Sequence, residues 1–224
     1  MIGNQRVRVK ICGITRFDDA VTAVRAGVDA LGFIFYEQSP RYIDPEEAKI
    51  ILDELPPFVD SVGVFVDKKR KEVEEIIDYC RLDYVQLHGE ESPKYCERLA
   101  RFASPCEVLK AFRVGPHLTP ETIVDYSPYV RGFLFDTYKK GEKGGTGEVF
   151  DWSVIKKLNL RKPYLLAGGL DVENISKALK SVKPFGVDAN SGLETAPGRK
   201  NHALIVDFIQ KVRAFEYQQL VRHE

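Results

Sequence analysis

The sequence is poor in cysteine and has no excess of charge of either sign. Only four of its 224 residues are cysteine, and 33 Lys and Arg balance 33 Asp and Glu. A chain without a basic excess lacks the electrostatic footprint of a nucleic-acid binder. No apolar run approaches the roughly 18–20 residues that cross a bilayer, and no apolar signal segment follows Met1. We therefore expect a soluble cytoplasmic protein with neither nucleic acid nor membrane as a partner.

The spacing of the cysteines excludes two further classes of protein. They stand at positions 12, 80, 96 and 106, with no Cys-x-x-Cys pair and no His-rich neighbourhood. Disulfide scaffolds and zinc sites both need a recognisable framework of cysteine or histidine. Reduced thiols are the simplest interpretation, and no metal site is expected.

What the sequence does contain is a regular alternation of two kinds of segment. Short β-branched or aromatic runs lie at Val7–Ile11, Ala30–Phe35, Ser61–Val66, Tyr84–Leu87, Val108–Phe112, Gly132–Phe135, Tyr164–Ala167 and Phe185–Asp188. Helical periodicity marks Asp18–Ala26, Pro45–Leu55, Lys69–Cys80, Ser92–Phe102, Thr119–Tyr126, Trp152–Leu158, Val172–Lys180 and Ala203–Phe215. Such alternation predicts an α/β fold built from parallel β/α units.

Two architectures satisfy this pattern, an open doubly wound sheet and a closed barrel. Eight units in a compact chain, without a Gly-x-Gly-x-x-Gly turn after the first strand, favour a single-domain (β/α)8 TIM barrel. No linker or shift in composition divides the chain. Residues 1–224 are therefore expected to form one domain, with 216–224 as a peripheral C-terminal tail.

Glycines gather after the last three predicted strands. Backbone N–H groups at glycines approach an anion closely, and barrels commonly bind phosphate in the loops after strands seven and eight. Each cluster alone also has a structural explanation, because glycine pairs often end strands. Taken together, the clusters predict a phosphate site from Gly145, Gly147, Gly168, Gly169, Ser191 and Gly192.

Cys12 and Asp136 each end a predicted strand, and the two groups have complementary chemistry. Strands one and six of an eight-stranded barrel lie three steps apart, which leaves a gap of roughly 7–8 Å between inward side chains. A pentose fits between them, with a carboxylic acid on one side and a thiolate base on the other. We expect Cys12 to be partly exposed and Lys10 to lower its pKa. The alternative for Cys12 is a small buried hydrophobe.

Four further residues follow strand ends and are candidates for binding a substrate. Gln86 and His88 share one strand face, although a structural histidine is an equal alternative. Arg41 could bind a carboxylate bidentately, or it could simply be solvated. Asp188 could accept a hydrogen bond from a substrate amine or order the loop at Ser191.

A series of motifs then gives the chain a family resemblance. In order they are Lys10-Ile-Cys-Gly-Ile-Thr15, Gly32-Phe-Ile-Phe-Tyr36, Ser39-Pro-Arg-Tyr42, Val62-Gly-Val-Phe-Val66, Val85-Gln-Leu-His-Gly89, Gly144-Gly-Thr-Gly147, Phe150-Asp-Trp152, Ala167-Gly-Gly-Leu170 and Ser191-Gly-Leu-Glu194. Together they resemble the phosphoribosylanthranilate isomerases of tryptophan biosynthesis, over about residues 7–215. The first motif together with Gln-Leu-His-Gly is the most specific.

The resemblance implies an Amadori rearrangement without metal or organic cofactor. Asp136 would be the general acid that opens the furanose ring, and Cys12 the general base that removes the C2 proton. Arg41 would lie near the anthranilate carboxylate, and Asp188 near the amine. Asn190 departs from the small residue common before Ser191, which would change one phosphate contact.

Other functions stay open at this stage. Another phosphosugar barrel, such as the histidine-pathway isomerase or indole-glycerol-phosphate synthase, is one alternative, and a non-catalytic phosphosugar-binding barrel is another. The expected partner is the phosphoribosylanthranilate substrate, and the chain is expected to be a monomer or a homodimer.

Overall fold

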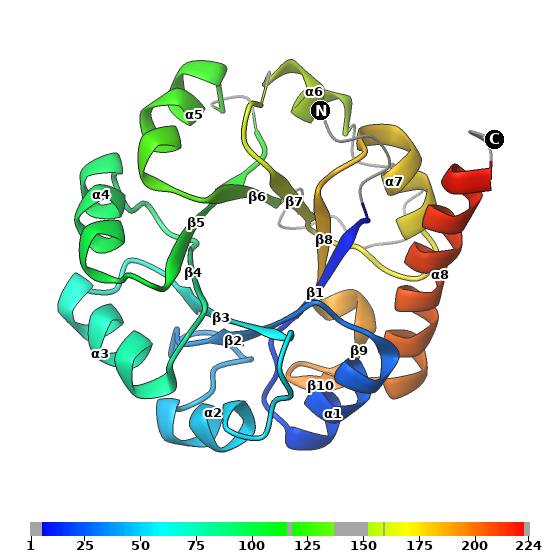
Figure 1. Cartoon of the computed structure of the whole chain (residues 1–224), viewed down its shortest axis with the longest axis horizontal. Coiled ribbons are helices and arrows are strands. Elements are labelled where there is room, and N and C mark those ends of the chain that lie inside the picture. The colour runs from blue at the N-terminus through cyan, green and yellow to red at the C-terminus, as the bar shows by residue number, and fades with distance from the viewer. Residues whose placement is uncertain (1–5, 116–117, 137–151, 159, 222–224) are drawn as a thin grey trace.

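The computed structural model describes residues 6–115, 118–136, 152–158 and 160–221. A ring of parallel strands forms the centre of the molecule, and helices surround it (Figure 1). The strands are β1 (Arg8–Cys12), β2 (Ala30–Ile34), β3 (Asp60–Phe65), β4 (Tyr84–Leu87), β5 (Glu107–Arg113), β6 (Gly132–Asp136), β7 (Tyr164–Ala167) and β8 (Gly186–Ala189). They pair in chain order, and β1 pairs with both β2 and β8. The closed barrel is thus confirmed.

Apart from the end of α8, the outer helices begin and end within about three residues of the predicted positions. They are α1 (Phe17–Ala26), α2 (Pro45–Leu52), α3 (Arg70–Cys80), α4 (Pro93–Phe102), α5 (Pro120–Tyr126), α6 (Ser153–Lys157), α7 (Ile175–Val182) and α8 (His202–Val221). Side-chain caps start several of them: Asp44 accepts from the N–H of Glu46 at 2.8 Å, and Ser92 from that of Tyr95 at 3.2 Å. Each cap satisfies a backbone donor that the first helical turn leaves unpaired.

Alternation along each strand separates two buried layers. On β1, Val9 and Ile11 point outward into the main core between the strands and the helices. Lys10 and Cys12 point the other way, into the barrel, where Cys12 joins a separate buried cluster. The interior of an eight-stranded barrel is only wide enough for side chains to fill it. Polar side chains that point into this interior therefore lie close to one another.

Several features in the second half of the chain differ from the prediction. A short 3-10 helix, η2 (Ser191–Leu193), follows β8, and a two-stranded hairpin, β9 (Glu194–Ala196) with β10 (Arg199–Lys200), follows η2. A further 3-10 turn, η1 (Ser127–Tyr129), follows α5. Helix α8 continues to Val221, six residues beyond its predicted end and into the expected tail. Along the described parts of the chain, no helix combines the length and apolarity needed to span a membrane.

The amino-terminal end of the barrel carries a cavity and a protruding aromatic ring. The cavity has a volume of about 610 Å³, and its lining includes Tyr84, Arg131 and Phe58. Phe58 is 99% exposed and has a φ of 71°. A bulky residue in the left-handed region is strained, and its full exposure means that no packing within the described chain offsets that strain.

Candidate active site

The register of four strands places the predicted acid and base at one end of the barrel. Asp136 pairs with Ala167 between β6 and β7, and Asp188 pairs with Lys10 between β8 and β1. Because β6, β7, β8 and β1 are consecutive, Asp136 and Cys12 end strands that lie three steps apart, as predicted. Barrel enzymes carry their active sites at this carboxyl end.

Lys10 and Asp188 form an ion pair inside the barrel. Lys10 Nζ lies 3.0 Å from Asp188 Oδ1, and the two side chains are only 2% and 7% exposed. Burial disfavours the charged amine, but the carboxylate of Asp188 and the thiol of Cys12 outweigh it and raise the pKa of Lys10. Lys10 is therefore a cation at neutral pH and lies next to Cys12.

Cys12 is more enclosed than the sequence predicts. It is 4% exposed and packs in a small cluster with Ile34, Val64 and Tyr36. The expectation of a partly exposed thiol is wrong because the side chain turns into the narrow barrel interior instead of the loop above it. The thiol nevertheless lies in the inner layer that it shares with Lys10, and not in the main core.

The pKa of Cys12 also moves opposite to the prediction. Burial raises the pKa of the thiol, and the positive charges of Lys10 and Lys200 offset only part of that increase. Gly32 on β2 leaves space for the contact between Lys10 and Cys12, because it has no side chain. A Cβ at this position would lie 2.8 Å from Cys12 Sγ and 3.0 Å from Lys10 Nζ. Near neutral pH Cys12 is therefore a protonated thiol with a cation beside it.

His88 links the predicted acid to a buried amide. Its Nε2 lies 3.4 Å from Asp136 Oδ2, and its Nδ1 lies 3.1 Å from Gln86 Nε2. With the Gln86 amide assigned as the donor, Nδ1 accepts and Nε2 carries the proton toward Asp136. Gln86 Oε1 is buried and has no hydrogen-bond partner in the described structure, so it can accept one from a ligand. The Asp136 side chain is 22% exposed, so a bound ligand must complete its desolvation.

A second buried ion pair holds the loop that carries His88. Lys110 Nζ lies 2.9 Å from Glu91 Oε2, with both side chains 2% exposed. Glu91 also accepts from the backbone N–H groups of Asp67 at 2.9 Å and Gly89 at 3.0 Å. These bonds join the loops after β3 and β4. The sequence analysis missed this pair, although a lysine within an apolar strand was a visible signal.

Two of the predicted phosphate clusters are brought together. Gly168 and Gly169 have φ values of 91° and 64°, in the left-handed region that favours glycine. Gly192 packs so closely against the carbonyl of Leu170 that a Cβ would collide with it. Ser191 begins η2, and a short extra helix after strand eight is a common part of barrel phosphate sites. The other two predicted residues lie outside the described parts of the chain: Gly145 and Gly147.

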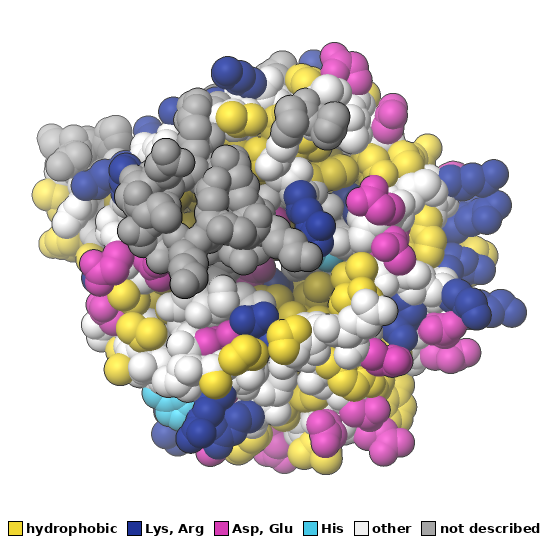
Figure 2. Space-filling model, turned by 180° about the vertical axis from the view of Figure 1, so that it is seen from behind, with side chains coloured by type: hydrophobic (Ala, Val, Ile, Leu, Met, Phe, Trp, Pro, Cys, Tyr) yellow, Lys and Arg dark blue, Asp and Glu magenta, His cyan; other side chains and the backbone are white. Residues whose placement is uncertain are grey.

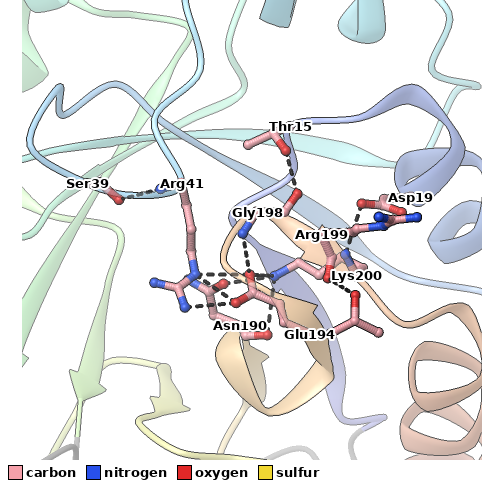
Figure 3. Close-up of polar contacts among 10 residues, drawn as sticks. Thr15, Asp19, Ser39, Arg41, Asn190, Glu194, Gly198, Arg199 and Lys200 are labelled. Carbon is pink, nitrogen blue, oxygen red and sulfur yellow. Dashed lines mark hydrogen bonds and ion pairs between the residues drawn. The ribbon is translucent and has the colours of Figure 1, made fainter.

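Arg41 is bound by a carboxylate that the sequence analysis did not assign (Figure 3). Its Nε and Nη2 donate to Glu194 at 2.9 and 2.8 Å. Lys200 Nζ donates to Glu194 Oε1 at 2.9 Å and to Asn190 Oδ1 at 2.8 Å. The side chain of Asn190, the residue that departs from the family pattern, is thus bound to Lys200.

The described residues hold no group of three or more His, Cys, Asp and Glu side chains arranged for a metal ion. On the face seen in Figure 2, acidic and basic side chains are intermingled around the rim. This mixture agrees with the balanced charge of the whole chain.

Glycine-rich loops at β7 and β8, a thiol beside a cation and a carboxyl group beside an imidazole all lie at one end of a closed barrel. This combination defines an acid–base enzyme of the phosphosugar barrel class. Residues 9–211 match the model of the N-(5'phosphoribosyl)anthranilate (PRA) isomerase family, and the chain belongs to that family.

The relatives match nearly the whole chain. A protein named N-(5'-phosphoribosyl)anthranilate isomerase from Geobacter sp. (strain M21) is 47% identical over 92% of this chain and 98% of its own length. The crystal structure of the Thermotoga maritima phosphoribosyl anthranilate isomerase has a TM-score of 0.82 and 43% identity, covering 93% and 99% of the two chains. Another solved isomerase, with a TM-score of 0.79, 40% identity and coverage of 93% and 99%, holds reduced 1-(o-carboxyphenylamino)-1-deoxyribulose 5-phosphate.

Proposed function

We propose that Cys12 and Asp136 carry out the reaction of the family in this chain. That reaction converts N-(5'-phosphoribosyl)anthranilate to 1-(2-carboxyphenylamino)-1-deoxyribulose 5-phosphate, and the chain is an isomerase of tryptophan biosynthesis. The observation that carries the assignment of roles is the placement of a thiol and a carboxyl group at the same end of strands three steps apart.

The reaction needs one proton donor and one proton acceptor on opposite sides of the sugar. Asp136 gives a proton to the furanose ring oxygen, the C1–O bond breaks, and a Schiff base forms between C1 and the aniline nitrogen. Cys12, as the thiolate, takes the proton from C2 to give an enolamine, which tautomerises to the ketone. In that tautomerisation C1 takes up the proton held by Cys12 and the 2-hydroxyl gives its proton to Asp136, so the thiolate and the carboxylic acid are both restored. No proton or electron is gained or lost overall, so the proposal needs no cofactor.

Charged and polar groups at the carboxyl end of the barrel each bind a different part of the substrate. The Gly168–Gly169 turn and the Ser191–Gly192 turn bind the phosphate through backbone N–H groups, as their glycine conformations favour. Arg41 binds the anthranilate carboxylate. Asp188 and the free Oε1 of Gln86 accept hydrogen bonds from the amine and the sugar hydroxyls.

The reaction is tested directly with purified protein. We expect the fluorescence of phosphoribosylanthranilate to disappear with enzyme-dependent kinetics, and the deoxyribulose product to appear in equal amount. The imidazole substrate of the histidine-pathway isomerase is expected to turn over at least about 10²-fold more slowly, because it lacks the carboxylate that Arg41 is proposed to bind. Ligand binding without product would instead indicate a binding protein.

We also propose the cytoplasm as the compartment and a homodimer as the assembly. All four cysteines are free and buried, which suits a reducing compartment. A second Thermotoga maritima structure, 40% identical with a TM-score of 0.79, is of monomers generated from a dimeric phosphoribosylanthranilate isomerase. In this chain the exposed Phe58 and the cavity of about 610 Å³ lie at the same end of the barrel. In a dimer with a two-fold axis the same surface of both copies forms the interface, so the protruding ring of each copy can enter the cavity of the other.

Phe58→Ser is expected to produce a monomer. Burial of the ring in a partner contributes roughly 1.5–3 kcal/mol, and two copies of the contact are lost together. Analytical ultracentrifugation over a range of concentrations measures the change in association. Tyr217→Ser, which removes another exposed aromatic ring on α8, is the matched control and should leave the mass unchanged. A wild-type protein that stays monomeric at high concentration contradicts the proposal.

A further inference from the structure

A network of charged side chains ties the loop after β2 to the hairpin after β8. Arg41 makes two parallel bonds to the carboxylate of Glu194, through Nε at 2.9 Å and Nη2 at 2.8 Å. Only 4% of the Glu194 side chain is exposed, against 20% for Arg41. The pair therefore has a buried acidic member and a more exposed basic member, and dashed lines mark their contacts in Figure 3.

Glu194 also accepts hydrogen bonds from groups other than Arg41. The buried ammonium of Lys200 donates to Oε1 at 2.9 Å, and the backbone N–H of Gly198 donates to the same oxygen at 3.3 Å. Lys200 is anchored in turn by Oδ1 of Asn190 at 2.8 Å. A carboxylate with this many partners has one orientation, so it can impose that orientation on Arg41.

The backbone leaves space for this arrangement at one specific position. Gly13 has a φ of 73°, and a Cβ there would lie 2.7 Å from Asn190 Oδ1 and 3.0 Å from Arg41 Cδ. Thr15 donates to the carbonyl of Gly198 at 2.6 Å, which fastens the hairpin to the loop after β1. The network is thus built from four separate segments of the chain.

The charges of the network are unequal. Arg41 and Lys200 supply two positive charges, and Glu194 supplies one negative charge. Glu194 is ionised, because its two cationic partners lower its pKa despite its burial. Bound to Nε and Nη2, Glu194 occupies one of the two edges with which a guanidinium meets a carboxylate. Among the described residues, the guanidinium binds only through Nε and Nη2, so the edge between Nη1 and Nη2 is available for a second carboxylate that would also balance the charge.

We propose that Glu194 is a positioning residue that orients Arg41 for the carboxylate of the substrate. The inference rests on the proposed function, since it assumes that Arg41 binds the anthranilate carboxylate. Lys200 and Asn190 support Glu194 and do not touch the substrate. Binding of the carboxylate, and not the chemical step, is the stage at which Glu194 acts.

A double-variant cycle tests this proposal. Glu194→Gln keeps the shape of the side chain and removes its charge, and we expect it to raise KM by about 10–100-fold with kcat within about 3-fold. Arg41→Ala is expected to have a similar effect. If Glu194 acts through Arg41, adding Glu194→Gln to Arg41→Ala changes kcat/KM by less than about 2-fold. The same factor in both backgrounds overturns the proposal.

A substrate analogue gives an independent readout. With N-(5'-phosphoribosyl)aniline, which lacks the carboxylate, Glu194→Gln and wild type should differ by less than about 2-fold, because the edge of Arg41 has nothing to bind. An equal loss on both substrates indicates a structural role and rejects the inference. Circular dichroism and thermal melting establish that each variant is folded.

Should Glu194→Gln leave Lys200 unpaired and unfold the protein, the Glu194→Gln/Lys200→Met variant removes both buried charges and is compared with Lys200→Met alone. The proposal then requires a larger rise in KM in the double variant than in Lys200→Met alone. Failure of the proposed function looks different, since wild type itself would not convert phosphoribosylanthranilate. If wild type converts the substrate but the effect of Glu194→Gln does not depend on Arg41, only the inference about Glu194 is contradicted.

Discussion

Asp136→Asn is expected to lower kcat by about 10²–10⁴-fold, the usual contribution of a general acid, while KM stays within a few-fold. Asparagine has the same shape as aspartate and can still form hydrogen bonds, but it has no acidic proton to give to the ring oxygen. Without protonation the C1–O bond breaks slowly, so the Schiff base does not accumulate. His88 cannot replace the acid, because its Nε2 faces Asp136 at 3.4 Å.

The measurement separates chemistry from binding. Steady-state kinetics give kcat, and titration with reduced 1-(o-carboxyphenylamino)-1-deoxyribulose 5-phosphate, the compound held by a solved relative, measures affinity. We expect Asp136→Asn to bind this compound nearly as well as wild type. Asp207→Asn on α8, where the carboxylate is 49% exposed, is the matched control and should keep full activity. Retention of a third or more of wild-type kcat by Asp136→Asn would remove Asp136 from the mechanism.

The barrel could be predicted because its signal is local and repeated. Strands buried on both faces appear as short apolar runs, and two of them, Tyr84–Leu87 and Tyr164–Ala167, have the predicted bounds. The predicted helix starts at Pro45 and Ser92 lie at or next to the observed ones, because a capping residue and the proline that follows it are neighbours in the sequence. Closure of the barrel then places every strand end on one rim, so the positions of Cys12 and Asp136 followed from topology alone.

The surroundings of those residues could not be predicted, because they come from distant parts of the chain. Arg41 and Glu194 are 153 residues apart, and the hairpin that carries Glu194 follows β8 without any periodic signal. The exposure of Cys12 depends on Ile34 and Val64, which β2 and β3 contribute to the same inner layer. Its pKa depends on how closely that layer excludes water, and spacing along one strand does not contain that information.

The second large effect is expected from Cys12→Ala, which should lower kcat by about 10²–10⁴-fold because no base remains to take the C2 proton. The methyl group fills part of the space of the thiol and leaves the ion pair between Lys10 and Asp188 intact. Binding of the reduced product analogue should change little. Cys96→Ala removes another buried thiol, outside the barrel interior, and serves as the matched control for the loss of a thiol from the fold.

A base with a raised pKa is strong but seldom ionised, and this determines how Cys12 should respond to pH. Only the thiolate is alkylated, so the rate of alkylation rises with pH until the pKa is passed. Because burial raises the pKa of Cys12 above that of an ordinary thiol, alkylation by iodoacetamide should still be increasing at pH values where a free cysteine has levelled off. Site-resolved mass spectrometry measures each cysteine separately, and Cys80 and Cys96, with pKa values of about 11, are internal references.

Two variants should shift this titration in opposite directions, which distinguishes charge from a general loosening of the fold. Lys10→Met removes the nearest cation, so the thiolate is less stable and the titration of Cys12 moves to higher pH. Asp188→Asn removes an anion that opposes the thiolate, so the titration moves to lower pH. A loosened barrel would admit water in both variants and lower the pKa of Cys12 in both. Shifts of opposite sign therefore require that Lys10 and Asp188 act on Cys12 through their charges, and shifts of the same sign contradict that interaction.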